Sequence, residues 1–269
     1  MIDSRRCSTV RSHKMARNGV RRMVAAGGAM LADARIGSLA DEAGERLFDP
    51  RFWAQRSGLT PVNGGRGAAW FIQEGSERWV LRHYRRGGFP ARFSSDRFLW
   101  TGESRVRAFV EYRLLEYLAQ GGLPVPGPVA ARYERRGLCY RCDLIMQRVP
   151  DARPLSALLD AAPMSDAHWI AVGAVIGRLH AAGVCHADLN AHNILLDGRG
   201  AVSIVDLDRG RIRRGAGRWR ARNLDRLHRS LLKLSRSMPA GRFTLDAWQS
   251  LLAGYTASAP DSRRIAGGG

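Results

Sequence analysis

The segment that most constrains this chain is HADLNAHNILLDGRGAVSIVDLD, residues 186–208, which carries three polar side chains spaced five and then thirteen residues apart. Asp188 and Asn193 come before two short apolar runs separated by turn residues at 197–200, and Asp206 comes after them. This order predicts a hairpin whose return strand brings Asp206 back to the loop. Carboxylate and amide oxygens are hard ligands suited to Mg²⁺. The alternative is a turn-rich loop in which these side chains only cap backbone groups.

The same segment resembles the catalytic loop of the protein-kinase superfamily. Its H-x-D-x-x-x-x-N core matches at His186, Asp188 and Asn193, and Asp206 resembles the metal-binding aspartate of that superfamily. The resemblance implies transfer of a phosphoryl group from ATP with Mg²⁺, Asp188 accepting the proton of the incoming hydroxyl while Asn193 and Asp206 hold the metal. Where the superfamily has D-F-G, the third residue here is Asp208, which is either a further acidic ligand or a strand-end residue.

Three upstream features lie in the order that such a fold requires. A glycine turn with Gly65 and Gly67 comes first, then the strand cation Arg82, then Glu111 on a predicted helix. By the resemblance, these four residues bind the nucleotide. Taken singly, a glycine pair is an ordinary turn and Glu111 an ordinary surface charge. The superfamily usually has lysine at the strand position, so either Arg82 replaces it or the phosphate is held differently.

The remaining pattern predicts an α+β, protein-kinase-like, two-lobed fold. Strand patterns dominate up to a shift in composition near Val149, and helical patterns dominate after it, although one helix is expected earlier, over residues 104–122. We expect a basic, flexible N-terminal extension over 1–40, a mostly-β N-lobe over 41–148, a mostly-α C-lobe over 149–258 and a flexible tail over 259–269.

The chain of 269 residues carries a net charge of +19, which implies a polyanionic partner such as nucleic acid, anionic lipid or a phosphorylated substrate. Nearly all of the positive charge is arginine, which a GC-rich genome would also produce. The sequence contains no adequate signal-peptide core or membrane span. We therefore expect a protein that stays on the cytoplasmic side and meets a membrane only peripherally. Four scattered cysteines are read as reduced thiols: Cys7, Cys139, Cys142 and Cys185.

The segment after Asp206 bears on the kind of substrate. No Ser, Thr or Tyr lies between Asp206 and Asn223, so this stretch has no activation loop that phosphorylation could switch. A regulated protein kinase is therefore disfavoured. The stretch instead holds a cluster suited to an acceptor rich in carboxylate and phosphate, with a solvated charge run as the alternative. The cluster consists of Arg209, Arg211, Arg213, Arg214, Arg218, Arg220 and Arg222.

From Leu47 to Leu234 the chain resembles the 3-deoxy-D-manno-octulosonic acid (Kdo) kinases. The resemblance lies in GRGAAWF, WVLRHYRRGGFPARF, FLW-x-G-E-S-R-x-R-A-F-x-E-Y, GLPVPGPVAARY and HADLNAHNILLD. It implies ATP-dependent phosphorylation of the 4-hydroxyl of Kdo on Kdo-lipid A, in lipopolysaccharide inner-core biosynthesis. It also implies a peripheral enzyme at the cytoplasmic side of the inner membrane, with no nucleic-acid partner.

Three expectations about partners remain open at this point. The aromatic segment 89–100, with the arginines of residues 85–97, is either a lipid-contacting loop or part of the core. A lipopolysaccharide heptose kinase, or another small-molecule kinase of the superfamily, would share Asp188, Asn193 and Asp206. A basic nucleic-acid-binding pseudokinase would show steep salt-dependent binding without turnover of ATP.

Overall fold

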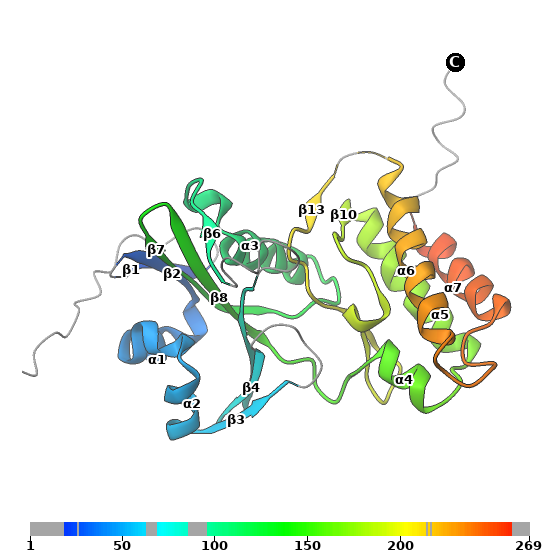
Figure 1. Ribbon diagram of the computed structural model, residues 1–269, viewed down its shortest axis with the longest axis horizontal. Helices are drawn as coiled ribbons and strands as arrows, with labels where there is room; N and C mark the ends of the chain where they lie inside the picture. Colours follow the sequence, from blue (N-terminus) through cyan, green and yellow to red (C-terminus); the bar gives the residue numbers. More distant parts are fainter. Residues whose placement is uncertain are drawn as a thin grey trace, which may run out of the picture. The chain divides into compact units, whose positions relative to one another are not determined.

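The computed structural model describes residues 19–25, 27–62, 69–85, 96–213, 215 and 217–259 (Figure 1). The chain divides into two compact units. The N-terminal unit contains Met1–Arg113 and Gly127–Arg148, and the C-terminal unit contains Leu114–Pro126 and Val149–Gly269. Within the described ranges, no helix combines the length and the apolar character needed to cross a bilayer.

The N-terminal unit is built on an eight-stranded antiparallel sheet in the order β1-β2-β7-β8-β5-β4-β3, with β6 paired to β8. Strand β5 shows why the sheet forms. Its residues alternate, so that Trp79 and Leu81 face one side of the sheet while Arg82 faces the other. The strands are β1 (Val20–Ala25), β2 (Gly28–Asp33), β3 (Gly58–Pro61), β4 (Ala69–Glu74), β5 (Glu77–His83), β6 (Phe98–Leu99), β7 (Pro128–Arg136) and β8 (Cys139–Gln147).

Two short helices, α1 (Gly37–Ala43) and α2 (Pro50–Arg56), cover one face of this sheet together with the 3₁₀ turn Gly44–Phe48 between them. Asp49 caps α2 by accepting a hydrogen bond from the backbone N–H of Arg51. Trp53 of α2 is fully buried, packs edge-on against Trp79 at 5.8 Å and donates to the Leu47 carbonyl at 2.7 Å. The longer helix α3 (Arg107–Gln120) follows β6, and the division between the units falls within it, after Arg113.

The expectation that residues 1–40 form a flexible extension is wrong for residues 19–25 and 27–40. Strands β1 and β2 pair along their whole length, and β2 continues the sheet by pairing with β7. Met23 and Met30 are at most 1% exposed and belong to the same core as Trp53. Burying one such side chain contributes about 1.5–3 kcal/mol. Sequence reasoning missed these strands because glycines and arginines interrupt their apolar pattern.

The C-terminal unit is mostly helical. Its helices are α4 (Leu155–Ala161), α5 (Asp166–Ala181), α6 (Trp219–Ser235) and α7 (Leu245–Ser258). Two small antiparallel sheets connect them, one in the order β12-β11-β9 and one formed by β10 and β13. Their strands are β9 (Arg153–Pro154), β10 (Val184–Cys185), β11 (Ile194–Leu196), β12 (Val202–Ile204) and β13 (Arg211–Ile212).

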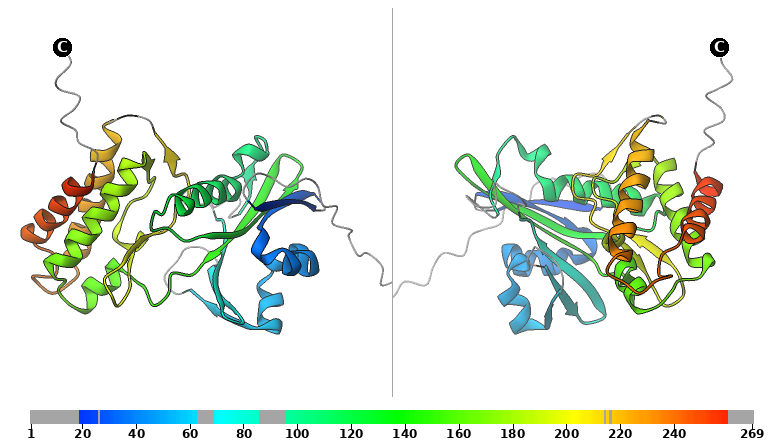
Figure 2. Two further views of the ribbon diagram at one scale, coloured as in Figure 1. Left: turned by 180° about the vertical axis from the view of Figure 1, so that it is seen from behind. Right: turned by 45° about the vertical axis from the view of Figure 1, so that its right-hand side comes forward.

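Helices α5 and α7 lie side by side in both views of Figure 2 and approach each other through glycine. A Cβ atom added at Gly173 of α5 would lie 1.9 Å from the Leu251 carbonyl oxygen, and one added at Gly254 of α7 would lie 2.1 Å from the Ile170 carbonyl oxygen. No larger residue fits either position without moving a helix. This close pair supports the chain just before the loop that carries Asp188.

The predicted α+β class, with a mostly-β N-terminal part and a mostly-α C-terminal part, is confirmed. The division between Arg148 and Val149 lies where the composition changes, but residues 114–126 group with the C-terminal unit although they were expected in the N-lobe. Cys139 and Cys142 lie in β8, and Cys142 is buried in the sheet, where burial raises its pKa to about 12.

Candidate active site

The hairpin predicted from the sequence forms between β11 and β12. Ile194 pairs with Ile204, and the backbone N–H of Val205 donates to the Asn193 carbonyl at 3.0 Å. Asn193 therefore lies just before the first strand and Asp206 just after the second, at the same end of the hairpin. Asp206 has a φ of 60°, a left-handed conformation that costs energy for a residue other than glycine and that occurs often at functional positions.

The loop before the hairpin is fixed by its own amide side chains. The Asn193 amide nitrogen donates to the Asp188 carbonyl at 2.9 Å, and the Asn190 amide nitrogen donates to the same carbonyl at 3.1 Å. Asn190 also accepts from the backbone N–H of His192 at 2.8 Å. These bonds hold Asp188 and Asn193 together while the Asp188 carboxylate stays 60% exposed.

The buried His186 links the loop to the strand end that carries Asp206. Its Nδ1 accepts from the Asp188 backbone N–H at 3.1 Å, so the ring proton lies on Nε2, which donates to the Val205 carbonyl at 3.0 Å. Burial lowers the pKa of His186, which keeps the ring neutral and preserves this arrangement of donor and acceptor. One imidazole thus links the backbone of Asp188 to the strand end next to Asp206.

Asn223 of α6 binds both backbone groups of His186. Its side-chain oxygen accepts from the His186 N–H at 3.1 Å, and its amide nitrogen donates to the His186 carbonyl at 2.9 Å. His180 of α5 lies against the same amide and bonds the Tyr255 hydroxyl of α7 at 3.0 Å. Burial lowers the pKa of His180 to about 4, so it too is neutral near pH 7. Three helices therefore fix the loop.

Arg226, one turn after Asn223 on α6, reaches the Asp188 carboxylate. Its Nη1 atom donates to Asp188 Oδ1 at 3.0 Å, and both side chains are substantially exposed, at 48% and 60%. Sequence reasoning did not select Arg226, because it lies beyond the arginine cluster of residues 209–222.

In the N-terminal unit, Arg82 of β5 pairs with Glu111 of α3. Both guanidinium Nη atoms contact the carboxylate, at 3.2 and 3.3 Å, and Glu111 is only 1% exposed. The Tyr84 hydroxyl also donates to Glu111, and Arg82 lies over the Tyr84 ring at 4.5 Å. Burial, together with the nearby Glu111 charge, raises the pKa of Tyr84 well above 10, so it remains a donor. Glu111 is therefore no surface charge.

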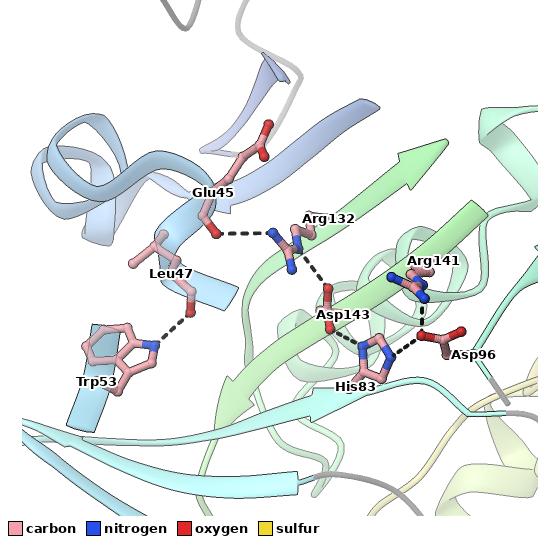
Figure 3. Close-up of polar contacts among 8 residues, drawn as sticks. All are labelled: Glu45, Leu47, Trp53, His83, Asp96, Arg132, Arg141 and Asp143. Carbon is pink, nitrogen blue, oxygen red and sulfur yellow. Dashed lines mark hydrogen bonds and ion pairs between the residues drawn. The ribbon is translucent and has the colours of Figure 1, made fainter. Parts of the chain in front are cut away.

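The opposite face of β5 carries a second polar chain, shown in Figure 3. His83 contacts Asp143 at 2.6 Å and Asp96 at 3.5 Å, while Arg132 and Arg141 hold these two carboxylates from the far sides at 2.7 and 2.8 Å. The hydrogen bond with Asp143 raises the pKa of His83. This chain fixes β5 next to Arg82, and Arg132 continues it to the Glu45 carbonyl.

The residues expected to hold Mg²⁺ fit that ion by their chemistry. The amide nitrogen of Asn193 is used on the loop, which leaves its oxygen for a cation, and Asp206 adds a carboxylate at the same hairpin end. In the part of the chain that the structure describes, no three His, Cys, Asp or Glu side chains gather as a metal site. Mg²⁺ does not need such a cage, because it takes one or two protein ligands and completes its shell with phosphate oxygens and water.

Comparison with known proteins adds two findings. The model of the lipopolysaccharide kinase (Kdo/WaaP) family matches residues 50–255. The chain is 50% identical over 194 residues to "3-deoxy-D-manno-octulosonic acid kinase" of Xanthomonas axonopodis pv. citri, covering 72% of this chain and 77% of that protein. A protein of the same name from Stenotrophomonas maltophilia is 49% identical over 189 residues, covering 70% and 75%.

The chain belongs to the lipopolysaccharide kinase (Kdo/WaaP) family. The family match includes every predicted site residue and begins after β1, β2 and α1. Within one unit the structure brings together Asp188, Asn193 and Asp206, and within the other it brings together Arg82 and Glu111. Gly65 and Gly67 lie outside the described residues, so their role in this family member stays a prediction.

The aromatic segment of this family member is only partly described. Phe89 and Phe93 lie outside the described residues. Phe98 is 7% exposed and packs against Tyr140 at 5.6 Å, while Trp100 packs against Tyr133 at 5.1 Å. For Phe98 and Trp100 the core-packing alternative is correct, because their rings cover the end of the sheet. Leu99 between them is 61% exposed.

The supporting residues were missed for an identifiable reason. Helix α6 begins at Trp219 and buries positions 219, 223, 227 and 231 along one stripe. That four-residue spacing is visible in the sequence and would have put Asn223 on the buried face. The arginines before Asn223 were instead interpreted as an acceptor-binding cluster or a solvated charge run, and not as the start of a helix.

Proposed function

We propose that this protein transfers the γ-phosphoryl group of ATP to the 4-hydroxyl of Kdo on Kdo-lipid A, in lipopolysaccharide inner-core biosynthesis. The observation that carries the proposal is the geometry of the Asp188 loop, which places Asn193 and Asp206 at the same end of one hairpin. The proposal is also supported by the 50% identity, over 194 residues, to a protein named as a Kdo kinase. No nucleic-acid partner is part of the proposal.

In the proposed reaction, Asp188 orients the acceptor hydroxyl and accepts its proton as the new O–P bond forms. Its backbone is held by Asn190, Asn193 and His186, while its carboxylate stays exposed, as a base that meets an incoming substrate must be. The neutral His186 takes no proton itself and keeps the loop in register with the hairpin.

Asn193 and Asp206 would hold Mg²⁺, which when bound neutralises charge on the phosphates of ATP. In the N-terminal unit, Arg82 would contact those phosphates. Its pairing with the buried Glu111 supports this role, because the pair holds the guanidinium in one orientation. The glycine turn with Gly65 and Gly67 would cover the phosphates through its backbone N–H groups.

The proposal is tested by transfer of radiolabelled γ-phosphate from Mg-ATP to purified Kdo-lipid A. Parallel reactions contain heptosylated core, a generic protein substrate or no acceptor. We expect label on Kdo-lipid A alone. Label on heptose would show that the protein is a heptose kinase and that the proposed acceptor is wrong. Absence of transfer to any acceptor, together with steep salt-dependent binding of DNA or RNA, would contradict the proposed enzyme activity and favour the nucleic-acid-binding pseudokinase.

The proposal includes peripheral contact with the cytoplasmic side of the inner membrane. It is supported by an exposed apolar tip, Leu99 of β6 and Leu138 of the β7–β8 turn, which are 61% and 77% exposed. A hydrogen bond from the Trp100 N–H to the Leu138 carbonyl, 2.8 Å, holds the two segments together. The exposed Arg135 and Arg136 lie beside this tip in the sequence, and apolar insertion with neighbouring positive charge suits an anionic lipid surface.

Flotation with vesicles that contain anionic phospholipid tests this contact. The double change Leu99→Ser with Leu138→Ser is expected to reduce the bound fraction. The matched control is Leu245→Ser, because Leu245 is also strongly exposed, at 69%, but lies at the start of α7. Equal binding by all three proteins would exclude this tip as the lipid contact.

A further inference from the structure

The ion pair between Arg226 and Asp188 does not have the features of a structural contact. Both side chains are about half exposed, and ion pairs between exposed side chains add little to stability. The loop is instead fixed through the backbone and buried side chains, by Asn193, His186 and Asn223. Arg226 therefore needs another explanation than the folding of the loop.

The position of Arg226 indicates that it meets a substrate. One of its five guanidinium donors is used on Asp188, and among the described residues its side chain has no other hydrogen bond. It enters from α6, whereas the residues proposed to hold Mg²⁺ lie on the hairpin. The residues between Asp188 and Asn193 supply no permanent cation, since they are Leu189, Asn190, Ala191 and His192.

We infer that Arg226 binds an oxyanion of the acceptor, a carboxylate or phosphate, beside the hydroxyl that Asp188 deprotonates. This inference rests on the proposed function. The acceptor is an acid, and a guanidinium fork binds a carboxylate or phosphate through two parallel N–H donors. Before the acceptor arrives, Asp188 occupies one donor of Arg226. Arrival of the acceptor anion satisfies the guanidinium and leaves the Asp188 carboxylate for the hydroxyl proton.

The acceptor side is favoured over the phosphates of ATP because of where the charge lies. Arg226 follows the basic stretch that contains Arg218, Arg220 and Arg222, of which the last two belong to the same helix. The donor phosphates already have Mg²⁺ at the hairpin in the proposed reaction. A second anion from the acceptor would otherwise lie next to the negatively charged Asp188 without a compensating cation.

The test compares steady-state kinetics of the wild type, Arg226→Gln and Arg226→Lys with Kdo-lipid A as acceptor. Arg226→Gln is expected to raise the KM for the acceptor about 10-fold or more, because a charge-assisted contact is lost. The KM for ATP and the binding of a fluorescent ATP analogue stay unchanged. Arg226→Lys recovers part of the loss, since it keeps the charge without the fork.

The matched control is Arg229→Gln, which removes the same charge from an exposed position on the same helix. Among the described residues, no hydrogen bond or ion pair of the Arg229 side chain is present, so the acceptor KM should stay near that of the wild type. Equal effects of Arg226→Gln and Arg229→Gln on the acceptor KM would show that only the overall positive charge of the helix matters, and would overturn the inference. A raised KM for ATP, or a lower kcat with both KM values unchanged, would also overturn it. Absence of turnover by the wild type would contradict the proposed function instead.

Discussion

At the residue scale, the central group is the Asp188 carboxylate. The backbone and the side chain of Asp188 have different environments. The backbone is held by three hydrogen bonds, while the carboxylate is exposed and contacts Arg226. A base that must meet an incoming hydroxyl requires this division, because a buried carboxylate could not reach the substrate.

Asp188→Asn removes the base and keeps the shape of the side chain. We expect kcat for phosphoryl transfer to fall by about 10²- to 10⁴-fold, the usual contribution of a positioned proton acceptor. Affinity for a fluorescent ATP analogue should stay unchanged, since Asp188 is not among the proposed nucleotide ligands. Asp160→Asn, an exposed carboxylate at the end of α4, serves as the control. Undiminished transfer by Asp188→Asn would remove Asp188 from the mechanism.

His83 gives a prediction about pH. Its pKa is raised by the hydrogen bond with Asp143 and by the neighbouring Asp96, so the charged form is more stable in the folded chain. This stabilisation is fully present below the unfolded pKa of about 6.5 and is lost as the pH rises through the higher folded value. His83→Gln should therefore lower the free energy of unfolding more at pH 5.5 than at pH 9. Urea unfolding at both pH values measures the difference, and an equal loss at both would show that folding does not raise the pKa of His83.

At the element scale, α6 is the helix that ties the catalytic loop to the rest of the C-terminal unit. Asn223 binds both backbone groups of His186 from its buried face, while Arg226 presents a cation to Asp188 from its exposed face. One helix thus carries a supporting residue and a proposed substrate-binding residue a single turn apart.

Asn223→Leu should damage the loop more than the helix. Both backbone groups of His186 would remain buried without a partner, at a cost of about 1–3 kcal/mol each. We expect a lower melting temperature and a kcat reduced beyond what the remaining folded fraction explains, because Asp188 is held only two residues away. Asp225→Asn on the exposed side of the same helix should change neither quantity. A variant that is destabilised but fully active once folded would show that Asn223 has no role in positioning the loop.

The α5–α7 pair gives a prediction about packing. Gly173→Ala places a methyl group 1.9 Å from the Leu251 carbonyl oxygen, so one helix must shift, and overpacking of this kind costs about 1–3 kcal/mol. Gly198→Ala adds the same methyl group where nothing lies within 4 Å. Chemical unfolding should show a large loss for the first change only. Equal stability of the two variants would mean that the helices are not in close contact.

Much of the element pattern was predictable, and the exceptions have physical causes. Strand β7 lies in the stretch before Val149 where strand patterns dominate, and the β11–β12 hairpin forms where its turn residues predicted it. Sequence periodicity shows such elements because their apolar residues recur regularly. Strands β1 and β2 were not predicted, because they are stabilised by the long-range pairing of β2 with β7 and not by a regular local pattern of apolar residues.

The candidate site was predictable in part for a similar reason. Asp188, Asn193 and Asp206 lie in one continuous segment, so their spacing could be read directly. Asn223 and Arg226 reach that segment only through the packing of α6, which no spacing within the segment reveals.

At the scale of the whole molecule, the two units divide the proposed work. The N-terminal unit holds Arg82 on a sheet braced by the His83 chain, and the C-terminal unit holds Asp188, Asn193 and Asp206. The net charge of +19 accords with a polyanionic partner but did not identify it, since nucleic acid and anionic glycolipid carry the same sign. The proposed acceptor rests on the family and on the relatives named Kdo kinases.

The most direct test of the central claim is the structure of the product. Kdo-lipid A incubated with Mg-ATP and the protein is examined by ³¹P–¹H correlation NMR, beside a reaction with the Asp188→Asn variant. The account predicts one new phosphomonoester whose phosphorus couples to the proton at C4 of Kdo, formed by the wild type and about 100-fold or more slowly by the variant. Coupling to any other position, or a product formed equally by Asp188→Asn, would contradict it.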